Sequence, residues 1–379
     1  MSAIQEIQHY TMPVTFMDSE DTVYLPSQLG SNIRILTENN MDIDALDLII
    51  LGCGELRGQD FRSSYSSGPD EIRRELYQLH YWHQQVRIGD LGNIIEGASV
   101  NDTRAALRSV LAELHQMGKK VLILGGSHDL TLQQYQVFRE LDEIVDLTVV
   151  DMLADLNQES DNRYDNYLME ALVETPNYVR HFNLIGFQSY YVNPLLIETF
   201  DKLRFDCVRV GRARENIDLL EPYFRNTHIG SIDINAIRYS DAPANRLASP
   251  NGFYGDEMCK ITRFAGMSTH MKSLGIYGYQ PEMDSHGITA KLLAQMIWYY
   301  IDGLQVQKTE SPLEERDQFF EYHITFTDNN ALFLKSKKTN RWWMQLPDES
   351  FMPCSHQDYI SACNNEIPER WMRELERLV

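Results

Sequence analysis

Short apolar runs alternate with amphipathic stretches along most of this chain, from about residue 45 to residue 304. Leu48-Ile49-Ile50-Leu51 is one such run, and Ile144 to Val150 is a longer, mainly apolar one. Strands of a parallel sheet are covered on both faces, so they read as nearly continuous apolar segments. Strands that alternate with helical patterns are typical of an α/β fold whose parallel sheet lies between helices.

The pattern is regular enough to place individual elements. A helix that begins near Asn101-Asp102 and one that ends the pattern at Thr289–Leu304 show apolar residues at helical spacing. Residues 1–44 have little periodicity, and we expect an irregular lead-in there. We expect strands at residues 48–51, 85–88, 121–124, 145–151, 182–187, 205–210, 227–233 and 272–277.

The last part of the chain, residues 305–379, departs from this alternation. Residues 321–326 and 331–334 flank Asp328-Asn329-Asn330, a sequence that favours a β-hairpin. A further strand is expected near Arg341-Trp342-Trp343-Met344, with the two tryptophans as packing residues, and a closing helix at 368–378. The chain is therefore divided into a lead-in (1–44), an α/β domain (45–304) and a C-terminal extension of hairpin and helix (305–379).

Composition narrows the class of protein. The 379 residues are 43% hydrophobic and 23% charged, which is ordinary for a globular protein. The balance of 34 basic and 55 acidic residues, a net charge of -21, argues against a nucleic-acid partner, which needs Lys and Arg for its phosphates. The five cysteines show no CxxC spacing, and there is neither a signal-peptide pattern nor an apolar run of about 18 residues. We expect a reduced, cytoplasmic protein without a membrane partner.

Candidate ligands for a metal ion follow three of the expected strands. His128 lies in Gly-Gly-Ser-His-Asp, Asp151 and Asp155 come after the run that ends at Val150, and Asp233 follows another strand. Parallel strands end at one edge of the sheet, where α/β proteins bind ligands. Carboxylate and imidazole donors suit a hard divalent cation. Each residue alone has an ordinary explanation as a cap or turn residue, but their convergence predicts a metal site.

Because these candidate ligands follow one another in the order His128, Asp151, Asp155 and Asp233, the sequence resembles the arginase family of metal-dependent ureohydrolases, and within it the formimidoylglutamase branch. The resemblance covers roughly residues 45–304. It implies a three-layer αβα sandwich with a central, mostly parallel sheet of about eight strands, two manganese ions that activate a bridging hydroxide, and a trimer or hexamer. The further motifs that carry it are Gly68-Pro69 through Arg73, Asp90-x-Gly92, Gly186-Phe187-Gln188, Ser231-x-Asp233, Asn251-Gly252 through Glu257, and Pro281 with Asp284.

Two departures from the family pattern affect one ion more than the other. The family has Asp-x-His-x-Asp where this chain has Leu153 in the middle, and Ser-x-Asp-x-Asp where this chain ends in Asn235. The resemblance assigns His128, Asp151, Asp155 and Asp233 to one ion and the two altered positions to the other alone. The three remaining carboxylates carry a charge of -3, so the site with one divalent ion bound has a net charge of -1. We therefore expect at most one ion, Mn²⁺ or Mg²⁺.

The catalytic candidates are Asp155 and Glu257. Glu257 matches the family glutamate that pairs with the cationic amidine of the substrate, but it also fits a carboxylate in the first turn of a helix. Gly278 and Gln280 stand where the family has a further glutamate and an asparagine.

Two functions follow from these observations. The first is hydrolysis of a C–N bond in a formimino or guanidino compound by a homo-oligomeric enzyme with one ion. The alternative is an inactive homologue that acts as a scaffold, sensor or partner subunit. An unrelated α/β hydrolase is disfavoured because no Gly-x-Ser-x-Gly motif occurs.

Overall fold

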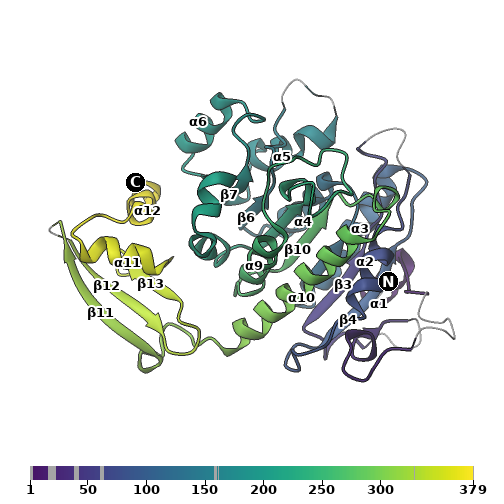
Figure 1. The fold of residues 1–379 in the computed structure, drawn as a ribbon, viewed down its shortest axis with the longest axis horizontal. Helices are drawn as coiled ribbons and strands as arrows, with labels where there is room; N and C mark the ends of the chain where they lie inside the picture. Colours follow the sequence, from purple (N-terminus) through teal and green to yellow (C-terminus); the bar gives the residue numbers. More distant parts are fainter. Residues whose placement is uncertain are drawn as a thin grey trace.

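A central sheet lies between two layers of helices, and a smaller sheet with its own helices adjoins it (Figure 1). The computed structural model describes residues 3–15, 23–37, 42–59, 64–157, 160, 162–327 and 329–378. The N-terminus and the C-terminus lie on opposite sides of the molecule (Figure 1). Within the described ranges, no helix combines the length and apolar character needed to cross a bilayer.

The main sheet confirms the expected mostly parallel architecture. Eight parallel strands run in the order β4-β3-β5-β10-β9-β6-β7-β8, and two short strands pair with β4 at the edge, β1 antiparallel and β2 parallel. The bounds are β1 Thr11–Met12, β2 Arg34–Ile35, β3 Leu48–Gly52, β4 Ile88–Ile94, β5 Lys120–Leu124, β6 Val145–Val150, β7 Val179–Phe187, β8 Asp206–Arg209, β9 Ile229–Asp233 and β10 Ser273–Tyr277.

Successive residues of a strand belong alternately to two separate hydrophobic cores, one on each face of the sheet. Leu48 and Ile50 of β3 belong to the core on one face, and Ile49 and Leu51 belong to the core on the other. This period of two is what burial of both faces requires. The first core is completed by α2 (Gly68–Leu76), α7 (Val210–Glu215), α8 (Glu221–Phe224), α9 (Gly255–Gly266) and α10 (Ile288–Thr309), and the second by α1 (Ala3–Tyr10), α3 (Val100–Gln116), α4 (Thr131–Glu140), α5 (Arg163–Val173) and α6 (Pro194–Lys202).

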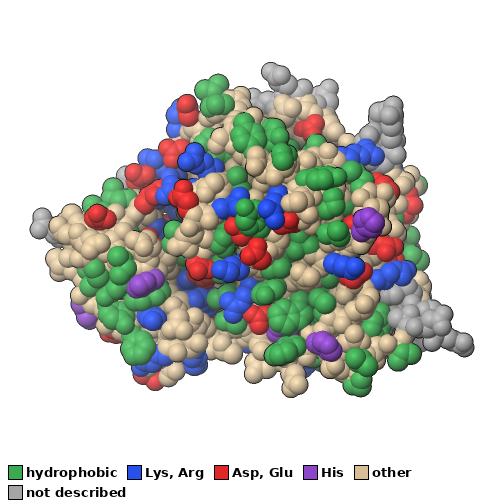
Figure 2. Space-filling model, in the orientation of Figure 1, with side chains coloured by type: hydrophobic (Ala, Val, Ile, Leu, Met, Phe, Trp, Pro, Cys, Tyr) green, Lys and Arg blue, Asp and Glu red, His purple; other side chains and the backbone are tan. Residues whose placement is uncertain are grey.

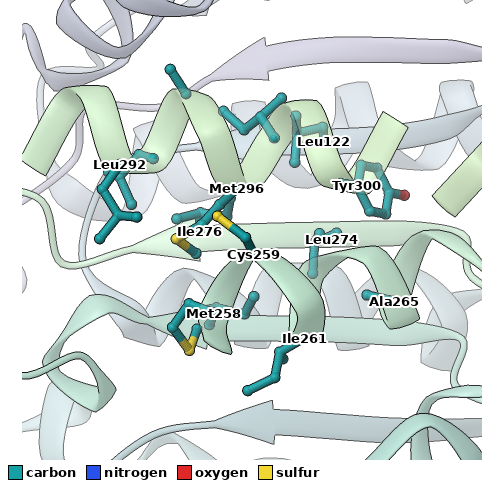
Figure 3. Packing of buried hydrophobic residues seen from close by; sticks show 14 of the residues in the cluster. Leu122, Met258, Cys259, Ile261, Ala265, Leu274, Ile276, Leu292, Met296 and Tyr300 are labelled. Atoms are coloured by element: carbon teal, nitrogen blue, oxygen red, sulfur yellow. The ribbon is translucent and has the colours of Figure 1, made fainter. Parts of the chain in front are cut away.

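Helices α9 and α10 pack closely against each other and the sheet. Met296 and Tyr300 of α10 lie with Met258 of α9 in one buried cluster (Figure 3). The backbones of the two helices are in contact at Gly266 and Gly303, where a Cβ on Gly303 would lie 2.2 Å from the Arg263 carbonyl oxygen. Because glycine has no Cβ, the two helices can cross in contact here, whereas a larger residue at either position would push them apart.

Two elements differ from the sequence expectation. The lead-in is not wholly irregular, because α1 packs Ile7 into the second core beside α3. Strand β4 begins at Ile88, where we expected it to end, and includes Asp90. Asp90 is fully buried but accepts hydrogen bonds from Arg73 Nε at 2.8 Å and from the Tyr77 hydroxyl at 2.8 Å. A charged residue can occupy this buried strand because Arg73 neutralises it.

The C-terminal extension contains the expected hairpin, strand and closing helix, together with a strand and a helix that we did not expect. Its antiparallel sheet has the order β11-β12-β13-β14, and α11 and α12 cover one face. Trp342 and Trp343 are both buried, as packing residues should be. The bounds are β11 Phe319–Phe326, β12 Asn329–Ser336, β13 Trp342–Gln345, β14 Phe351–Cys354, α11 His356–Cys363 and α12 Glu369–Leu378.

Two buried arginines, each held by an ion pair within its own part of the chain, join the extension to the α/β domain. Arg341 Nε lies 2.9 Å from Glu310 Oε2, and Arg341 Nη1 donates to the Met267 carbonyl oxygen at 2.9 Å. Arg225 pairs with Glu221, donates to the Trp342 carbonyl and stacks its guanidinium 4.5 Å from the centre of the Trp343 ring. Basic and acidic side chains also intermingle on the surface where α12 faces the domain (Figure 2). The extension is thus an integral part of the structure.

Because His228 is largely buried, we expect the protein to lose stability in mild acid. Its Nδ1 accepts a hydrogen bond from the Asp146 backbone N–H at 3.1 Å, and burial lowers its pKa to about 4. The unfolded chain therefore takes up this proton near pH 6.5 while the folded chain does not, so stability should fall by about 2 kcal/mol as the pH drops from 6.5 to 4. Urea unfolding at pH 7 and pH 5 should show a smaller fall for His228→Gln, whereas His9→Gln, at an exposed position, should behave as wild type.

Candidate metal centre

The four predicted ligands converge at the carboxyl edge of the main sheet. His128 follows β5 in a short 3-10 turn, His128–Leu130, and Asp155 lies just beyond Asp151, the first residue after β6. Asp233 is the last residue of β9. The chain can turn sharply before His128 because Gly125 and Gly126 have φ angles of +80° and +83°, a conformation that favours glycine.

Gly126→Ala should be severely destabilising. A Cβ at this position would lie 2.4 Å from Leu130 Cδ1 and 2.6 Å from the Cys53 carbonyl oxygen, in addition to the strained φ. We expect a loss of about 3 kcal/mol or more in the free energy of unfolding. Gly118→Ala is the matched control, because Gly118 has a φ of +70° but nothing within 4 Å of the added Cβ. Its cost should be only about 1 kcal/mol, and equal losses in thermal unfolding would contradict the steric argument.

Three carboxylates surround one nitrogen of His128. Its Nδ1 lies 3.0 Å from Asp151 Oδ2, 3.0 Å from Asp155 Oδ2 and 3.7 Å from Asp233 Oδ2. His128, Asp151 and Asp233 each offer a ligand atom within 4.8 Å of the others. The second oxygens of Asp151 and Asp233 accept backbone hydrogen bonds from Leu153 and Asn235, each at 2.8 Å. These bonds hold the remaining oxygens toward the centre of the cluster.

A hydroxyl chain orients the imidazole. Thr131 Oγ1 donates to the His128 carbonyl oxygen at 2.8 Å, so its hydrogen is already used. Ser231 Oγ, 2.5 Å from Thr131 Oγ1, therefore donates to Thr131 and can accept from His128 Nε2 at 2.9 Å. A hydrogen bond that fixes one ring nitrogen leaves the other for a metal ion. Nδ1, the nitrogen that faces the carboxylates, is the available ligand.

The negative charge of the three carboxylates favours binding of a cation in the cluster. An Nδ1–H can serve one carboxylate, and the hydrogen-bond geometry assigns it to Asp155. Asp151 Oδ2 is buried and receives no hydrogen bond. Burial, together with the charge of Asp151, raises the pKa values of Asp155 and Asp233. Burial alone would lower the pKa of His128, but Asp151 and Asp155 raise it well above its usual range. A hard cation would satisfy all inward oxygens at once.

The two altered positions contribute no further carboxylate or imidazole. Leu153 presents an apolar side chain, and Asn235 uses its Oδ1 to accept from the Met152 backbone N–H at 3.2 Å. Gly278 cannot carry the glutamate of the family, since its φ is +86° and a Cβ would lie 2.5 Å from Asp233 Oδ1.

Glu257 is not brought to this cluster. Its carboxylate accepts from the Tyr254 backbone N–H at 2.7 Å in a capping box at the start of α9 and lies 3.1 Å from Arg214 Nε. This is the capping role that the sequence left open. A catalytic role for Glu257 stays a prediction without support from the geometry.

Two tyrosines that we did not single out from the sequence cover the cluster. Tyr164 and Tyr167 are one helical turn apart on α5, and both are buried. The Tyr164 hydroxyl lies 3.4 Å from Asp233 Oδ2, and the Tyr167 hydroxyl lies 3.2 Å from His128 Nε2. The four predicted ligands themselves are at most 6% exposed. The spacing of the tyrosines was the only signal in the sequence, and it is equally typical of a helix face that packs in the core.

The fold and the cluster define a three-layer α/β protein with a candidate cation site at the carboxyl edge of its sheet. The sequence profile of the arginase family matches residues 46–302, and the chain belongs to that family. The formimidoylglutamase of Lysinibacillus sphaericus is 23% identical over 294 residues, which are 73% of this chain and 91% of that protein.

Solved structures share the fold. The formimidoylglutamase of Bacillus subtilis gives a TM-score of 0.66 at 15% identity, over 77% of this chain and 96% of that one. A formiminoglutamase of Trypanosoma cruzi, determined with Mn²⁺, gives a TM-score of 0.63 at 17% identity, over 73% of this chain and 98% of that one. Residues 305–379 lie beyond the matched profile.

Proposed function

We propose that this protein is a formimidoylglutamase-like hydrolase that cleaves a C–N bond in a formimino or guanidino compound with a single bound ion, Mn²⁺ or Mg²⁺. His128, Asp151, Asp155 and Asp233 would hold the ion. When bound, such an ion lowers the pKa of a water molecule. Asp155 would be the proton acceptor, since its carboxylate lies within the cluster, with Oδ2 3.0 Å from His128 Nδ1.

The observation that carries the proposal is the cluster of inward-facing atoms. Three buried carboxylates within 3.7 Å of one imidazole nitrogen carry more negative charge than a single proton can balance. The Mn²⁺ in the Trypanosoma cruzi structure supports manganese as the natural choice. The proposal further includes a cytoplasmic homo-oligomer with a small-molecule substrate and without nucleic-acid or membrane partners.

Metal analysis and a turnover assay test the proposal together. The purified chain, stripped with a chelator and dialysed against Mn²⁺, should retain about one equivalent. Release of ammonia or formamide from formiminoglutamate, or of urea from arginine, should then depend on that metal. One bound equivalent without turnover of either compound would contradict hydrolysis but not metal binding.

The burial of the four predicted ligands favours a second, non-catalytic function. The ligands are nearly inaccessible, and Tyr164 and Tyr167 lie against them. A hydrolytic site must admit its substrate, so this arrangement suits a non-catalytic homologue that acts as a scaffold, sensor or partner subunit. Absence of both metal and turnover would support this function over the first.

Restoring the two altered donors should create a second ion site. Leu153→His with Asn235→Asp adds an imidazole and a carboxylate beside Asp151 and Asp233. We expect a second equivalent of Mn²⁺ and at least about a tenfold rise in turnover. Leu153→His alone is the control, because it lacks the added carboxylate. If the double variant folds but holds only one equivalent, the two departures do not explain the loss of the second ion.

A further inference from the structure

Strand β11 is an edge strand of the smaller sheet, with β12 as its neighbour on one side. It lies at the outer side of the extension, away from the α/β domain (Figure 1). Proteins usually protect an exposed edge with charged side chains, a proline or a bulge. The eight residues of β11 include no proline, and their register with β12 is continuous. The opposite edge, β14, contains Pro353 and packs against α8, so β11 is the edge that is open to another strand.

The pairing with β12 determines which backbone groups of β11 point outward. The Lys337 backbone N–H donates to the Gln318 carbonyl oxygen at 3.0 Å, in the same register as the strand pair. Hydrogen-bonded and non-hydrogen-bonded pairs alternate along an antiparallel ladder, so the even-numbered residues of β11 bond to β12. The Phe319 N–H is bonded to the Arg316 carbonyl oxygen. The groups that point away from β12 are the N–H and C=O of Glu321, His323 and Thr325 and the carbonyl of Phe319.

We propose that β11 pairs antiparallel with β11 of a second copy of this chain, with Glu321 opposite His323 of the copy. Only odd-numbered residues can face each other, because their backbone groups are the ones that point outward. Moving the register by one step in either direction places Glu321 opposite its own copy or His323 opposite its own copy. Like charges directly opposite each other destabilise a strand pair, whereas a carboxylate opposite an imidazole is favourable. The two-fold symmetry forms this favourable pair twice.

The other face of the strand fits the same register. Tyr322 then lies opposite its own copy, and Phe320 lies opposite Ile324 of the copy. Phe320 is 49% exposed in the single chain, while Tyr322 and Ile324 are half-buried. Cross-strand pairs of aromatic and β-branched side chains stabilise a sheet. Pairing in this register therefore covers the exposed apolar side chain of the strand, and the two small sheets become one closed, two-fold symmetric sheet.

This inference rests on the proposed function only in that the protein forms a homo-oligomer, and it does not depend on the metal site. It assigns the contact to a part of the chain that lies beyond the matched family profile, which ends at residue 302. Failure of the contact would leave the proposed hydrolase, and any oligomer formed by the α/β domain, unaffected.

Cysteine crosslinking tests the register directly. In full-length protein whose exposed Cys363 is replaced by serine, Glu321→Cys and His323→Cys are prepared separately. Hydrogen-bonded partners of an antiparallel pair have Cα atoms about 5.5 Å apart, within reach of a disulfide. An equilibrated mixture of the two variants should form a disulfide-linked dimer under mild oxidation, and neither variant alone should do so. Glu314→Cys, at an exposed position outside the strand, measures crosslinking by random collision.

A disulfide in either variant alone, above the level of the collision control, would overturn the proposed register. No disulfide in the mixture would overturn the pairing itself. If wild type also sediments as a monomer, the homo-oligomer of the proposed function fails as well, whereas an oligomer that persists would mean that only the β11 contact is wrong.

Charge substitutions provide a second measurement that needs no oxidation. His323→Glu places two carboxylates opposite each other and should weaken self-association at least about tenfold in sedimentation velocity. Glu321→Lys combined with His323→Glu exchanges the charges and should restore association, while Glu314→Lys should leave it unchanged. Unweakened association of His323→Glu, or a double variant that associates no better than His323→Glu, would contradict the pairing of these two residues.

Discussion

Asp151→Asn is expected to reduce Mn²⁺ affinity at least about 100-fold and, at the same time, to stabilise the metal-free protein. The Asp151 oxygen that faces His128 is buried and receives no hydrogen bond, and two further carboxylates share the cluster. Removing one of three like charges relieves repulsion when no cation is present. We expect a gain of roughly 1–3 kcal/mol in the metal-free protein.

Isothermal titration with Mn²⁺ and thermal unfolding with a chelator measure the two effects. Asp218→Asn is the matched control, since this carboxylate is 73% exposed and lies only near Lys260 at 3.9 Å. It should change neither quantity. A variant of Asp151 that binds Mn²⁺ like wild type would show that the cluster is not the metal site, whereas lower stability of the metal-free variant would mean that its charge is already balanced.

Arg341→Ala should cost about 3–5 kcal/mol, because it removes one partner of a buried ion pair. Arg341 and Glu310 are about 95% buried, with side-chain exposures of 4% and 5%. Without Arg341, Glu310 keeps only neutral partners among its hydrogen bonds: the Ser336 hydroxyl at 2.6 Å, the Thr339 hydroxyl and the Ser311 backbone N–H at 3.1 Å. The lost stability should appear as a lower midpoint of urea unfolding, since Arg341 also donates to the Met267 carbonyl oxygen of the α/β domain.

The control is Arg316→Ala, at an exposed arginine whose guanidinium stacks 4.3 Å from the centre of the Phe351 ring. Its cost should stay below about 1 kcal/mol. Arg341→Met combined with Glu310→Gln removes both charges and should recover most of the stability. Equal losses for Arg341→Ala and Arg316→Ala would mean that the buried ion pair contributes no more to stability than this exposed contact.

The sequence could predict the parallel sheet because strands buried on both faces are apolar throughout. The errors arose where a tertiary contact changes the meaning of a residue. Asp90 between two glycines is typical of a turn, and only its pairing with Arg73 and Tyr77 makes it acceptable in a strand. Helix α1 is short, and its burial depends on α3, nearly a hundred residues away along the chain. Local patterns do not contain such information.

The candidate site was predictable to a similar degree. The four predicted ligands follow three strands that end at one edge, so spacing and residue type were sufficient to group them. The role of Glu257 was not predictable, because a first-turn glutamate serves a helix cap as readily as a substrate. Nor could the sequence place Tyr164, since helical spacing shows that a side chain is buried but not what it contacts.

The order of the strands also constrains how the cation site comes into being during synthesis. Strand β10 supplies none of the four ligands, yet it lies between β5, which precedes His128, and β9, which ends in Asp233. The separation of these two ligands is therefore set by a strand that the ribosome delivers after both of them. A nascent chain that stops short of Ser273 has every ligand but lacks the spacer that holds them apart, so metal capture should await translation of residues 273–277.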